Sequence, residues 1–165
     1  MIILGIDPGY AIVGCGVIDY AANKFKVINH EAITTPAGMP FEERIGLIYD
    51  NLDLMIKKYN PEAIAVEELF FHTNHKTVIG VAQARGVIVL AAIKNNIPFF
   101  EYTPLQVKQS VVGYGRAVKA QVMEMTRVIL GLATVPKPDD VADALAIAIC
   151  HAHNSGSALN RIKKY

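Results

Sequence analysis

Four carboxylates in this sequence stand beside predicted strands and helices, in positions that could bring them to one site. Asp7 and Glu67 each end a short apolar run that is typical of a buried strand. Asp140 and Asp143 are three residues apart in a predicted helix, so they share one face of it. A buried carboxylate is costly unless a partner compensates its charge, and a shared cation would be such a partner.

An acidic cluster without Cys or His ligands predicts a hard cation such as Mg²⁺, for which Mn²⁺ can substitute, in place of zinc. Mg²⁺ keeps part of its water shell and shares phosphate oxygens with a substrate, so the cluster indicates phosphodiester chemistry. Two cations about 4 Å apart would activate an attacking water and stabilise the leaving oxygen. For Asp7 alone the alternative is a turn residue, because Pro8 and Gly9 follow it and form a tight turn.

Positive charge gathers in the middle of the chain. Residues 1–75 carry five Lys or Arg and ten Asp or Glu, whereas residues 76–130 carry seven and two, although the net charge is only +1. Lys108, Arg116 and Lys119 flank a glycine-containing loop and the predicted start of a helix, which is a favourable place for phosphate contacts. An acidic site with a basic surface beside it suits a metal-dependent enzyme that acts on nucleic acid. Solvated surface charge is the alternative.

Two adjacent aromatic residues, Phe70 and Phe71, follow Glu67 in a predicted polar loop. Such rings either fold back as an anchor in the core or stay exposed to a partner. Exposed rings can stack on bases, which contributes about 1–3 kcal/mol per base. Both residues are therefore candidates for DNA binding, with the core anchor as the alternative.

The apolar pattern predicts an α/β chain that opens with three antiparallel strands, the third over residues 24–35 after a hairpin turn at 21–23. The elements predicted next are a helix over 41–59, a strand over 62–66, a helix over 76–95, a strand over 97–102, and helices that begin at 104, 119 and 139. The helix over 76–95 is apolar almost all round, which predicts one face on the sheet and another on a second subunit.

The length of 165 residues fits one domain, which we place at residues 1–154, followed by a short basic tail at 155–165 that we expect to be flexible. No apolar run reaches the roughly 18 residues of a membrane span, and no secretory signal is evident. Cys15 and Cys150 lie far apart in apolar segments, which predicts buried free thiols in a reducing cytoplasm.

Five segments occur in a specific order between residue 3 and about residue 153: GIDPG, VEELFF, QARG, QVKQSVVGYGRAVKAQV and DDVADALAIAICH. This ordered set resembles the RuvC family, the bacterial Holliday-junction resolvases of the ribonuclease-H-like superfamily. The resemblance implies a five-stranded mixed sheet with helices on both faces. It also implies a homodimeric, Mg²⁺-dependent, structure-selective endonuclease of recombination and repair. Such an enzyme makes paired symmetric nicks in two junction strands of like polarity and leaves 5′-phosphate and 3′-OH ends.

The resemblance also assigns roles to single residues. The acidic metal ligands of the family match four positions here: Asp7, Glu67, Asp140 and Asp143. Lys108 and Lys119 match basic residues near the scissile phosphate, and Phe70 matches an aromatic residue that stacks on bases at the crossover, a role that Phe71 could also fill. Two metal ions in each active site and an association with the RuvA and RuvB branch-migration proteins are further implications.

Three other classes remain as alternatives. Actin-like ATPases and sugar kinases open with a similar strand, Asp and Gly, but they need two such domains, for which 165 residues are too few. A different ribonuclease-H-like nuclease could act on another DNA or RNA structure. A non-catalytic module could bind junctions without cutting them, but four carboxylates would then repel one another without a metal.

Overall fold

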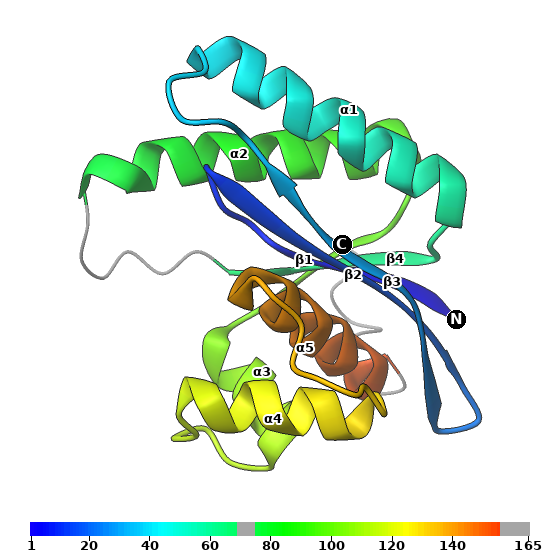
Figure 1. Ribbon diagram of the computed structural model, residues 1–165. Coiled ribbons are helices and arrows are strands. Elements are labelled where there is room, and N and C mark those ends of the chain that lie inside the picture. The colour runs from blue at the N-terminus through cyan, green and yellow to red at the C-terminus, as the bar shows by residue number, and fades with distance from the viewer. Residues whose placement is uncertain (69–74, 156–165) are drawn as a thin grey trace.

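The computed structural model describes residues 1–68 and 75–155, and in this part the chain forms a five-stranded sheet with helices on both faces (Figure 1). The bounds of the elements, in chain order, are β1 (Ile2–Asp7), β2 (Ile12–Ala21), β3 (Lys24–Thr34), α1 (Phe41–Tyr59), β4 (Ala63–Glu67), α2 (His75–Lys94), β5 (Phe99–Tyr102), α3 (Pro104–Val112), α4 (Lys119–Ile129) and α5 (Asp139–Asn154). The predicted bounds differ from these by at most two residues.

The sheet is mixed, with its strands in the order β3-β2-β1-β4-β5. β2 pairs antiparallel with β1 and with β3, whereas β4 pairs parallel with β1 and with β5. The prediction of three antiparallel strands at the start of the chain is confirmed. Ala22 and Asn23 join β2 to β3 with φ angles of 50° and 60°, and this left-handed two-residue turn matches the twist of a hairpin.

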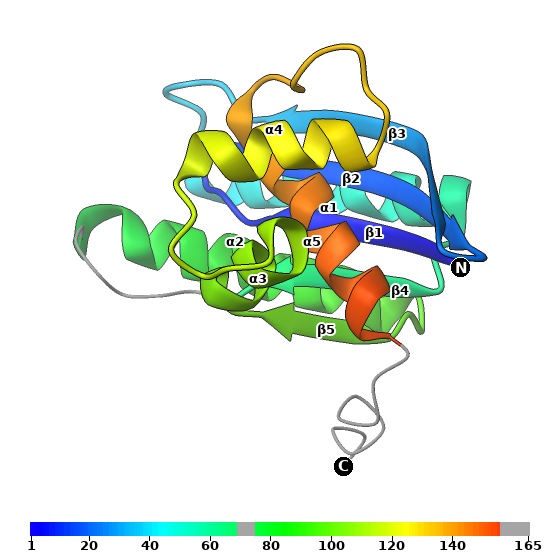
Figure 2. The ribbon, with the colours of Figure 1, turned by 90° about the horizontal axis from the view of Figure 1, so that it is seen from below.

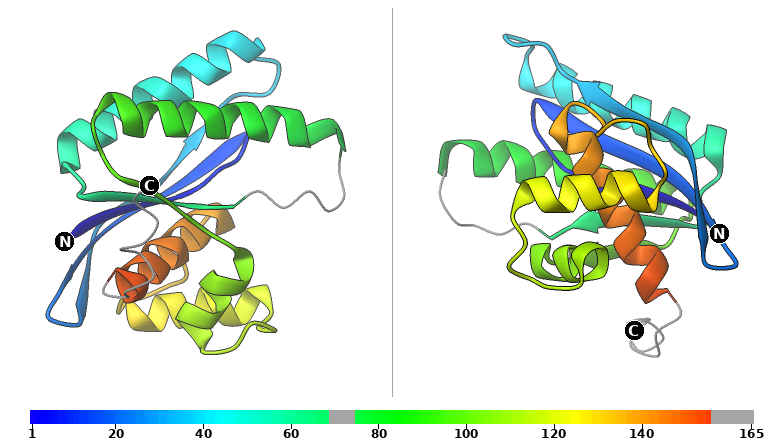
Figure 3. Two further views of the ribbon diagram at one scale, coloured as in Figure 1. Left: turned by 180° about the vertical axis from the view of Figure 1, so that it is seen from behind. Right: turned by 60° about the horizontal axis from the view of Figure 1, so that its bottom comes forward.

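The helices form two layers, with α1 and α2 on one face of the sheet and α3, α4 and α5 on the other (Figures 1 and 3). One core cluster joins α1 and α2 to the sheet and includes Ile48, Leu52 and Ile88. A second cluster includes Leu145 and Ile149 of α5. In Figure 2, α5 lies against the sheet, and α3 and α4 pack on α5. Helices on both faces are therefore confirmed.

Glycines in β1 and β2 let the backbone of α5 touch the sheet. A Cβ atom on Gly14 would lie 1.9 Å from the carbonyl oxygen of Asp140, and one on Gly5 would lie 2.1 Å from that of Ala144. Only glycine leaves room for such a close approach of two backbones. Gly14 pairs with Asp7 across the β1–β2 ladder, so the first turn of α5 is seated beside the end of β1.

Both cysteines are buried free thiols, as their apolar surroundings in the sequence predict. Burial raises the pKa of Cys15 and of Cys150, so both thiols stay protonated, and Sγ of Cys150 accepts a hydrogen bond from the hydroxyl of Ser110 at 3.3 Å. Within the described residues, no helix combines the length and the apolar character needed to cross a membrane.

Candidate active site

Three elements bring the four predicted carboxylates to one edge of the sheet. Asp7 is the last residue of β1, and Glu67 is the last residue of β4. Because β1 and β4 are parallel neighbours, their carboxyl ends lie side by side. Asp140 and Asp143 belong to the first part of α5, which is seated on β2 beside Asp7. The site thus depends on contacts between segments that are far apart in the chain.

The electrostatics of the four carboxylates show that they lie close together. Burial raises the pKa of Asp7 from 3.8 to about 8, and the charges of the other three carboxylates add to this effect. Burial also raises the pKa of Glu67, again with a contribution from the charge of Asp143. For Asp143 itself, burial is the largest cause of a raised pKa. Because like charges in a poorly solvated site disfavour ionisation, the cluster favours the binding of positive charge.

Lys119, the first residue of α4, makes direct contact with this cluster. Its Nζ atom donates a hydrogen bond to Oδ2 of Asp143 at 2.8 Å, and this bond raises the pKa of the lysine. The positive charge of Lys119 lowers the pKa values of Asp7 and Glu67 and so opposes the effect of burial. Lys108 on α3 acts on Glu67 in the same direction. The two lysines therefore compensate part of the negative charge.

Asp139 and Asp140 are adjacent in the chain but lie in different environments. The side chain of Asp139 is 42% exposed and accepts a hydrogen bond from Lys137 at 2.7 Å. That bond lowers the pKa of Asp139, whereas Asp140 is one of the charges that raise the pKa of Asp7. Oδ2 of Asp139 also lies 3.8 Å from Nζ of Lys119, and both aspartates raise the pKa of Asp143. The effect on Asp7 supports Asp140 as the member of the carboxylate cluster.

A cavity of about 260 Å³ opens at this edge of the sheet. Its polar wall consists of Glu67, Lys108, Lys119 and Asp143. The apolar wall opposite is lined by Pro104, Val107, Val122 and Ile147. Apolar surroundings strengthen electrostatic interactions, so a phosphate in this cavity would interact with the lysines more strongly than it would in water.

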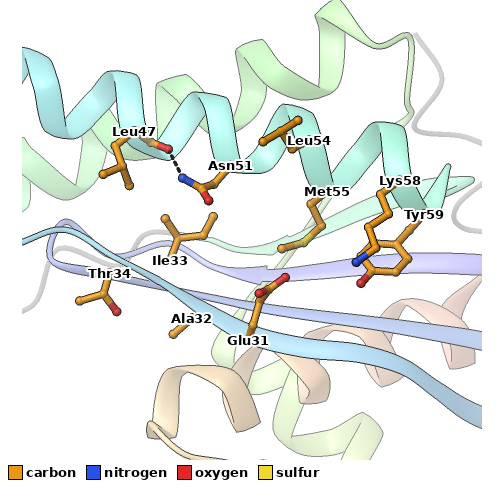
Figure 4. A pocket seen from close by; sticks show the side chains of 10 residues that line it. All are labelled: Glu31, Ala32, Ile33, Thr34, Leu47, Asn51, Leu54, Met55, Lys58 and Tyr59. Carbon is orange, nitrogen blue, oxygen red and sulfur yellow. Dashed lines mark hydrogen bonds between the residues drawn. The ribbon is translucent and has the colours of Figure 1, made fainter.

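A larger concavity of about 450 Å³ lies between α1 and the edge strand β3 (Figure 4). Leu47, Leu54 and Met55 of α1 line it, and Asn51 donates a hydrogen bond to the carbonyl oxygen of Leu47 at 2.8 Å. Among its lining residues, Glu31 supplies the single carboxylate. Its other polar lining residues, Thr34, Asn51, Lys58 and Tyr59, add no second carboxylate that could share a metal ion, so we place the chemistry at the smaller cavity.

The donor set at the smaller cavity fits a hard divalent cation. In the described part of the chain, no group of three or more Asp, Glu, His or Cys side chains is arranged so that it could hold a metal ion. Mg²⁺ does not require such a cage, because it binds through one or two carboxylates together with water and substrate phosphates. Among the residues that line the cavity, Glu67 and Asp143 supply the carboxylate oxygens for such a shared site, whereas Asp7 and Asp140 do not line it.

Of the other predicted DNA-binding residues, the structure describes Arg116. Arg116 is exposed in the connection between α3 and α4, and it does not line the cavity. Gly113 ends α3 with a φ of 89°, as the glycine-containing loop predicts. Phe70 and Phe71 lie outside the described residues.

One buried charged residue next to the site, Arg44 of α1, is not anticipated from the sequence. Its side chain is only 6% exposed, and it lies against the ring of Tyr10 in the turn that follows Asp7. The sequence does contain an indication of this burial, because Arg44 stands four residues before Ile48 and so lies on the same, core-facing side of the helix. Sequence reasoning misses such a residue because arginine is usually expected to face solvent.

Comparison with known proteins identifies the family. The sequence model of the RuvC family, described as crossover junction endodeoxyribonuclease RuvC, matches residues 3–151. The chain belongs to the RuvC family. The crossover junction endodeoxyribonuclease RuvC of Alkaliphilus oremlandii is 61% identical over 153 residues, which cover 93% of this chain and 93% of that protein.

Two solved structures of Thermus thermophilus RuvC are also similar to this RuvC-family chain. One has a TM-score of 0.86 at 39% sequence identity and covers 94% of this chain and 95% of the other. The second, T. thermophilus RuvC in complex with a Holliday junction substrate, has a TM-score of 0.89 at 39% identity and covers 94% of each chain. The predicted ribonuclease-H-like fold is confirmed.

Membership of the RuvC family also confirms the prediction of an enzyme. The chain is a crossover junction endodeoxyribonuclease, a nuclease that hydrolyses phosphodiester bonds. Membership of this family further implies dependence on a divalent metal. The ATPase and sugar-kinase alternative is thereby excluded.

The raised pKa of Asp7 predicts how metal binding depends on pH. With the pKa of Asp7 raised to about 8, a cation that binds Asp7, as we predict, would displace a proton below about pH 8. We therefore expect the apparent affinity for Mg²⁺ to rise by up to about tenfold per pH unit from pH 6 and to level off above pH 8. Calorimetric titration of Mg²⁺ in several buffers would measure the affinity and the protons released.

The matched control for this titration is Asp139→Asn, which removes a carboxylate from the same helix turn without removing a member of the cluster. This variant should show the same pH dependence as the wild type. An affinity that stays constant between about pH 6 and about pH 8 would contradict the proton displacement at Asp7.

Proposed function

We propose that this chain resolves Holliday junctions by metal-dependent hydrolysis at the cluster formed by Asp7, Glu67, Asp140 and Asp143. The observation that carries the proposal is the convergence of these side chains from β1, β4 and α5, with Lys119 within 2.8 Å of Asp143. The products would be nicks with 5′-phosphate and 3′-OH ends. The fold and the family support this reading.

The proposed mechanism divides the work among the residues of the site. Two Mg²⁺ ions, when bound, would activate the attacking water and stabilise the leaving oxygen of the phosphodiester. Asp7 and Glu67 would hold the metal ions from the sheet, and Asp140 and Asp143 would hold them from α5. Burial around Asp7 would strengthen its interaction with positive charge. Mn²⁺ is expected to substitute because it accepts the same oxygen ligands.

The basic residues beside the cavity hold the DNA. Lys119 stands at the first position of α4, where its ammonium group and the helix N-terminus both attract phosphate. Lys108 lines the same cavity and would bind the scissile phosphate or its neighbour. Arg116 in the connecting loop would contact the backbone further along the strand. Phe70 or Phe71 would stack on bases at the crossover.

A homodimer would give two active sites for the two strands that are cut, since a two-fold enzyme matches a two-fold arrangement of strands. The surface of α2 supports this part of the proposal. Ile79, Leu90 and Ile93 are 67%, 47% and 63% exposed, and their spacing places them on one face of the helix. Three large apolar side chains in one stripe on a monomer indicate a protein contact. We therefore propose this exposed apolar face of α2, among the described residues, as the dimer surface.

Changing Ile93→Glu is expected to convert the proposed dimer to a monomer, because a buried charge in an apolar contact is strongly unfavourable. Sedimentation at several concentrations would measure the mass. The monomer should keep its helical content and lose coordinated cleavage of two strands. Leu105→Glu on α3 introduces the same charge at another exposed apolar residue, 54% exposed, and should leave the mass unchanged. A dimer that survives Ile93→Glu would exclude this face.

The proposed function also places the protein in its cellular setting. The nuclease domain would span residues 1–154, with a basic tail at residues 155–165. The protein would work in the cytoplasm, where the RuvA–RuvB branch-migration complex would present the junction. These parts rest on the family resemblance.

The experiment that tests the proposal is cleavage of a labelled synthetic four-way junction in the presence of Mg²⁺. The strands of the junction are labelled one at a time, and a linear duplex with the sequence of one arm serves as the comparison. We expect nicks at symmetric positions in two strands of like polarity, with ends that DNA ligase seals. Binding without cleavage would favour the junction-binding module. Cleavage of RNA hybrids or flaps, with junctions left intact, would favour a different nuclease.

A further inference from the structure

The turn between β1 and β2, residues 8–11, continues directly from Asp7, and a buried guanidinium lies beneath it. Arg44 on α1 is 6% exposed. Its charge is compensated by no carboxylate, since no ion pair of Arg44 occurs among the residues described. Burying an arginine without an acidic partner is costly. An apolar residue of similar size would fill this space with less loss of solvation, so the guanidinium must serve a purpose that packing alone does not explain.

The guanidinium donates hydrogen bonds to Thr35 and Pro36, and Thr35 itself contacts the turn. Nη2 of Arg44 donates to the carbonyl oxygen of Pro36 at 2.7 Å, and Nη1 donates to the carbonyl oxygen of Thr35 at 3.2 Å and, over a short distance, to its hydroxyl. That hydroxyl donates to the carbonyl oxygen of Tyr10 at 3.0 Å and lies 3.2 Å from that of Ala11. The Thr35 backbone N–H also donates to Ala11 at 2.9 Å. Arg44 thus reaches the turn through one intermediate residue.

The ring of Tyr10 is held from three sides. The Cζ atom of Arg44 lies 4.5 Å from the ring centroid, a cation–π contact. Phe41 at the start of α1 stacks on the ring, with centroids 6.0 Å apart and an interplanar angle of 18°. On α2, a Cβ atom at Gly80 would lie 3.0 Å from Cδ2 of the ring, so the helix touches it with no side chain between. The ring therefore connects the turn after Asp7 to both helices of this face.

We propose that Tyr10, whose ring lies against the buried guanidinium of Arg44, is a positioning residue that holds the turn after Asp7 against α2. The position of α2 matters because this helix follows Glu67 in the chain, separated from it by the short segment that contains Phe70 and Phe71. The contact fixes Asp7 on β1 relative to the element that follows Glu67 on β4. The inference rests on the proposed function, in which both carboxylates take part in cleavage.

The test compares Tyr10→Leu with Tyr10→Phe. Tyr10→Phe keeps the ring and the cation–π contact, and should cut a four-way junction in a single turnover as fast as the wild type. Tyr10→Leu keeps apolar volume but removes the ring face, and should be about 10- to 100-fold slower, the usual effect of losing a supporting residue. Junction affinity measured without metal should change by less than about twofold in both variants, since positioning affects the chemical step and not the DNA contacts.

Two further variants complete the design. Gly80→Ala presses on the same ring from α2 and should slow cleavage while it spares junction affinity. Tyr49→Leu makes the same substitution at a tyrosine of α1 outside this network and should cut at the wild-type rate. All rates are normalised to the folded fraction, so a general loss of stability does not count as support.

Each outcome of this design supports or overturns either the inference or the proposed function. A Tyr10→Leu variant that cuts at the wild-type rate, or that loses affinity and rate equally, would overturn the inference. A wild type that does not cut junctions would instead overturn the proposed function. The fast cleavage expected of Tyr10→Phe separates a positioning role of the ring from a chemical role of its hydroxyl.

Discussion

Replacing Asp7 with Asn is expected to lower the rate of junction cleavage by at least about 10²-fold, because a metal ligand supports several kcal/mol of transition-state stabilisation. The amide is nearly the same size as the carboxylate, but it carries no charge to hold a cation. Junction binding without metal should be retained or slightly tighter, because one negative charge facing the DNA is removed. The loss should therefore appear in the rate and not in the affinity.

The stability of this variant gives an independent readout. The pKa of Asp7 is raised from 3.8 to about 8, so the folded protein holds a proton that the unfolded chain releases between these values. The folded state thus binds more protons, and the contribution of Asp7 to stability falls as pH rises from about 4 to about 8. Asp7→Asn removes this penalty, so the metal-free variant should unfold at a higher temperature than the wild type at pH 8.

Cleavage in a single turnover, junction affinity and thermal unfolding together test this prediction. Asp139→Asn is the control, since Asp139 pairs with Lys137 at 2.7 Å and more distantly with Lys119 at 3.8 Å, and both partners lower its pKa. It should cut nearly as fast as the wild type and gain no stability at pH 8. Wild-type activity in Asp7→Asn would remove Asp7 from the mechanism. An Asp7→Asn variant that unfolds at a lower temperature than the wild type at pH 8 would contradict the destabilising effect that we assign to the buried charge of Asp7.

A methyl group on Gly14 should be among the most damaging small changes outside the carboxylates, and it acts directly on the helix that carries Asp140 and Asp143. The added Cβ would lie 1.9 Å from the carbonyl oxygen of Asp140, a backbone atom that cannot move aside as the end of a flexible side chain can. Overpacking commonly costs about 1–3 kcal/mol, and a clash between two backbones belongs at the upper end or beyond. The helix can relieve the clash only by moving away, which would carry Asp140 and Asp143 from Asp7. A displacement of about 1 Å can reduce a rate by roughly 10²-fold.

Urea unfolding and single-turnover cleavage by the folded fraction would measure the two effects of Gly14→Ala separately. Gly46→Ala is the matched control, because no atom lies within 4 Å of a Cβ built at this exposed position of α1. Alanine is the better helix former, so that control should gain up to about 1 kcal/mol and keep its activity. If Gly14→Ala folds and cuts like the wild type, α5 is not seated on β2 through this contact.

Local patterns in the sequence were sufficient for the elements and for the candidate ligands. The apolar runs that end at Asp7 and Glu67 identify two buried strands, and the stripe over residues 41–59 identifies α1 with its observed bounds. These patterns report the period of a strand or helix, which depends on neighbouring residues only. Three of the carboxylates were conspicuous for the same reason, since Asp7 and Glu67 end apolar runs and Asp143 interrupts one, whereas Asp140 was selected by its spacing of three residues from Asp143.

The tertiary structure decided how those pieces meet. Only the tertiary structure shows that Gly14 leaves room for the backbone of α5 beside Asp7. Only the tertiary structure shows that Lys119 contacts Asp143. It also turns Arg44 inward, onto the ring of Tyr10, where sequence reasoning expects a charged residue to face solvent. Such contacts join residues that are tens of positions apart, and no periodic pattern records them. They depend on the shape and charge of the partner surface, which exists only after the chain has folded.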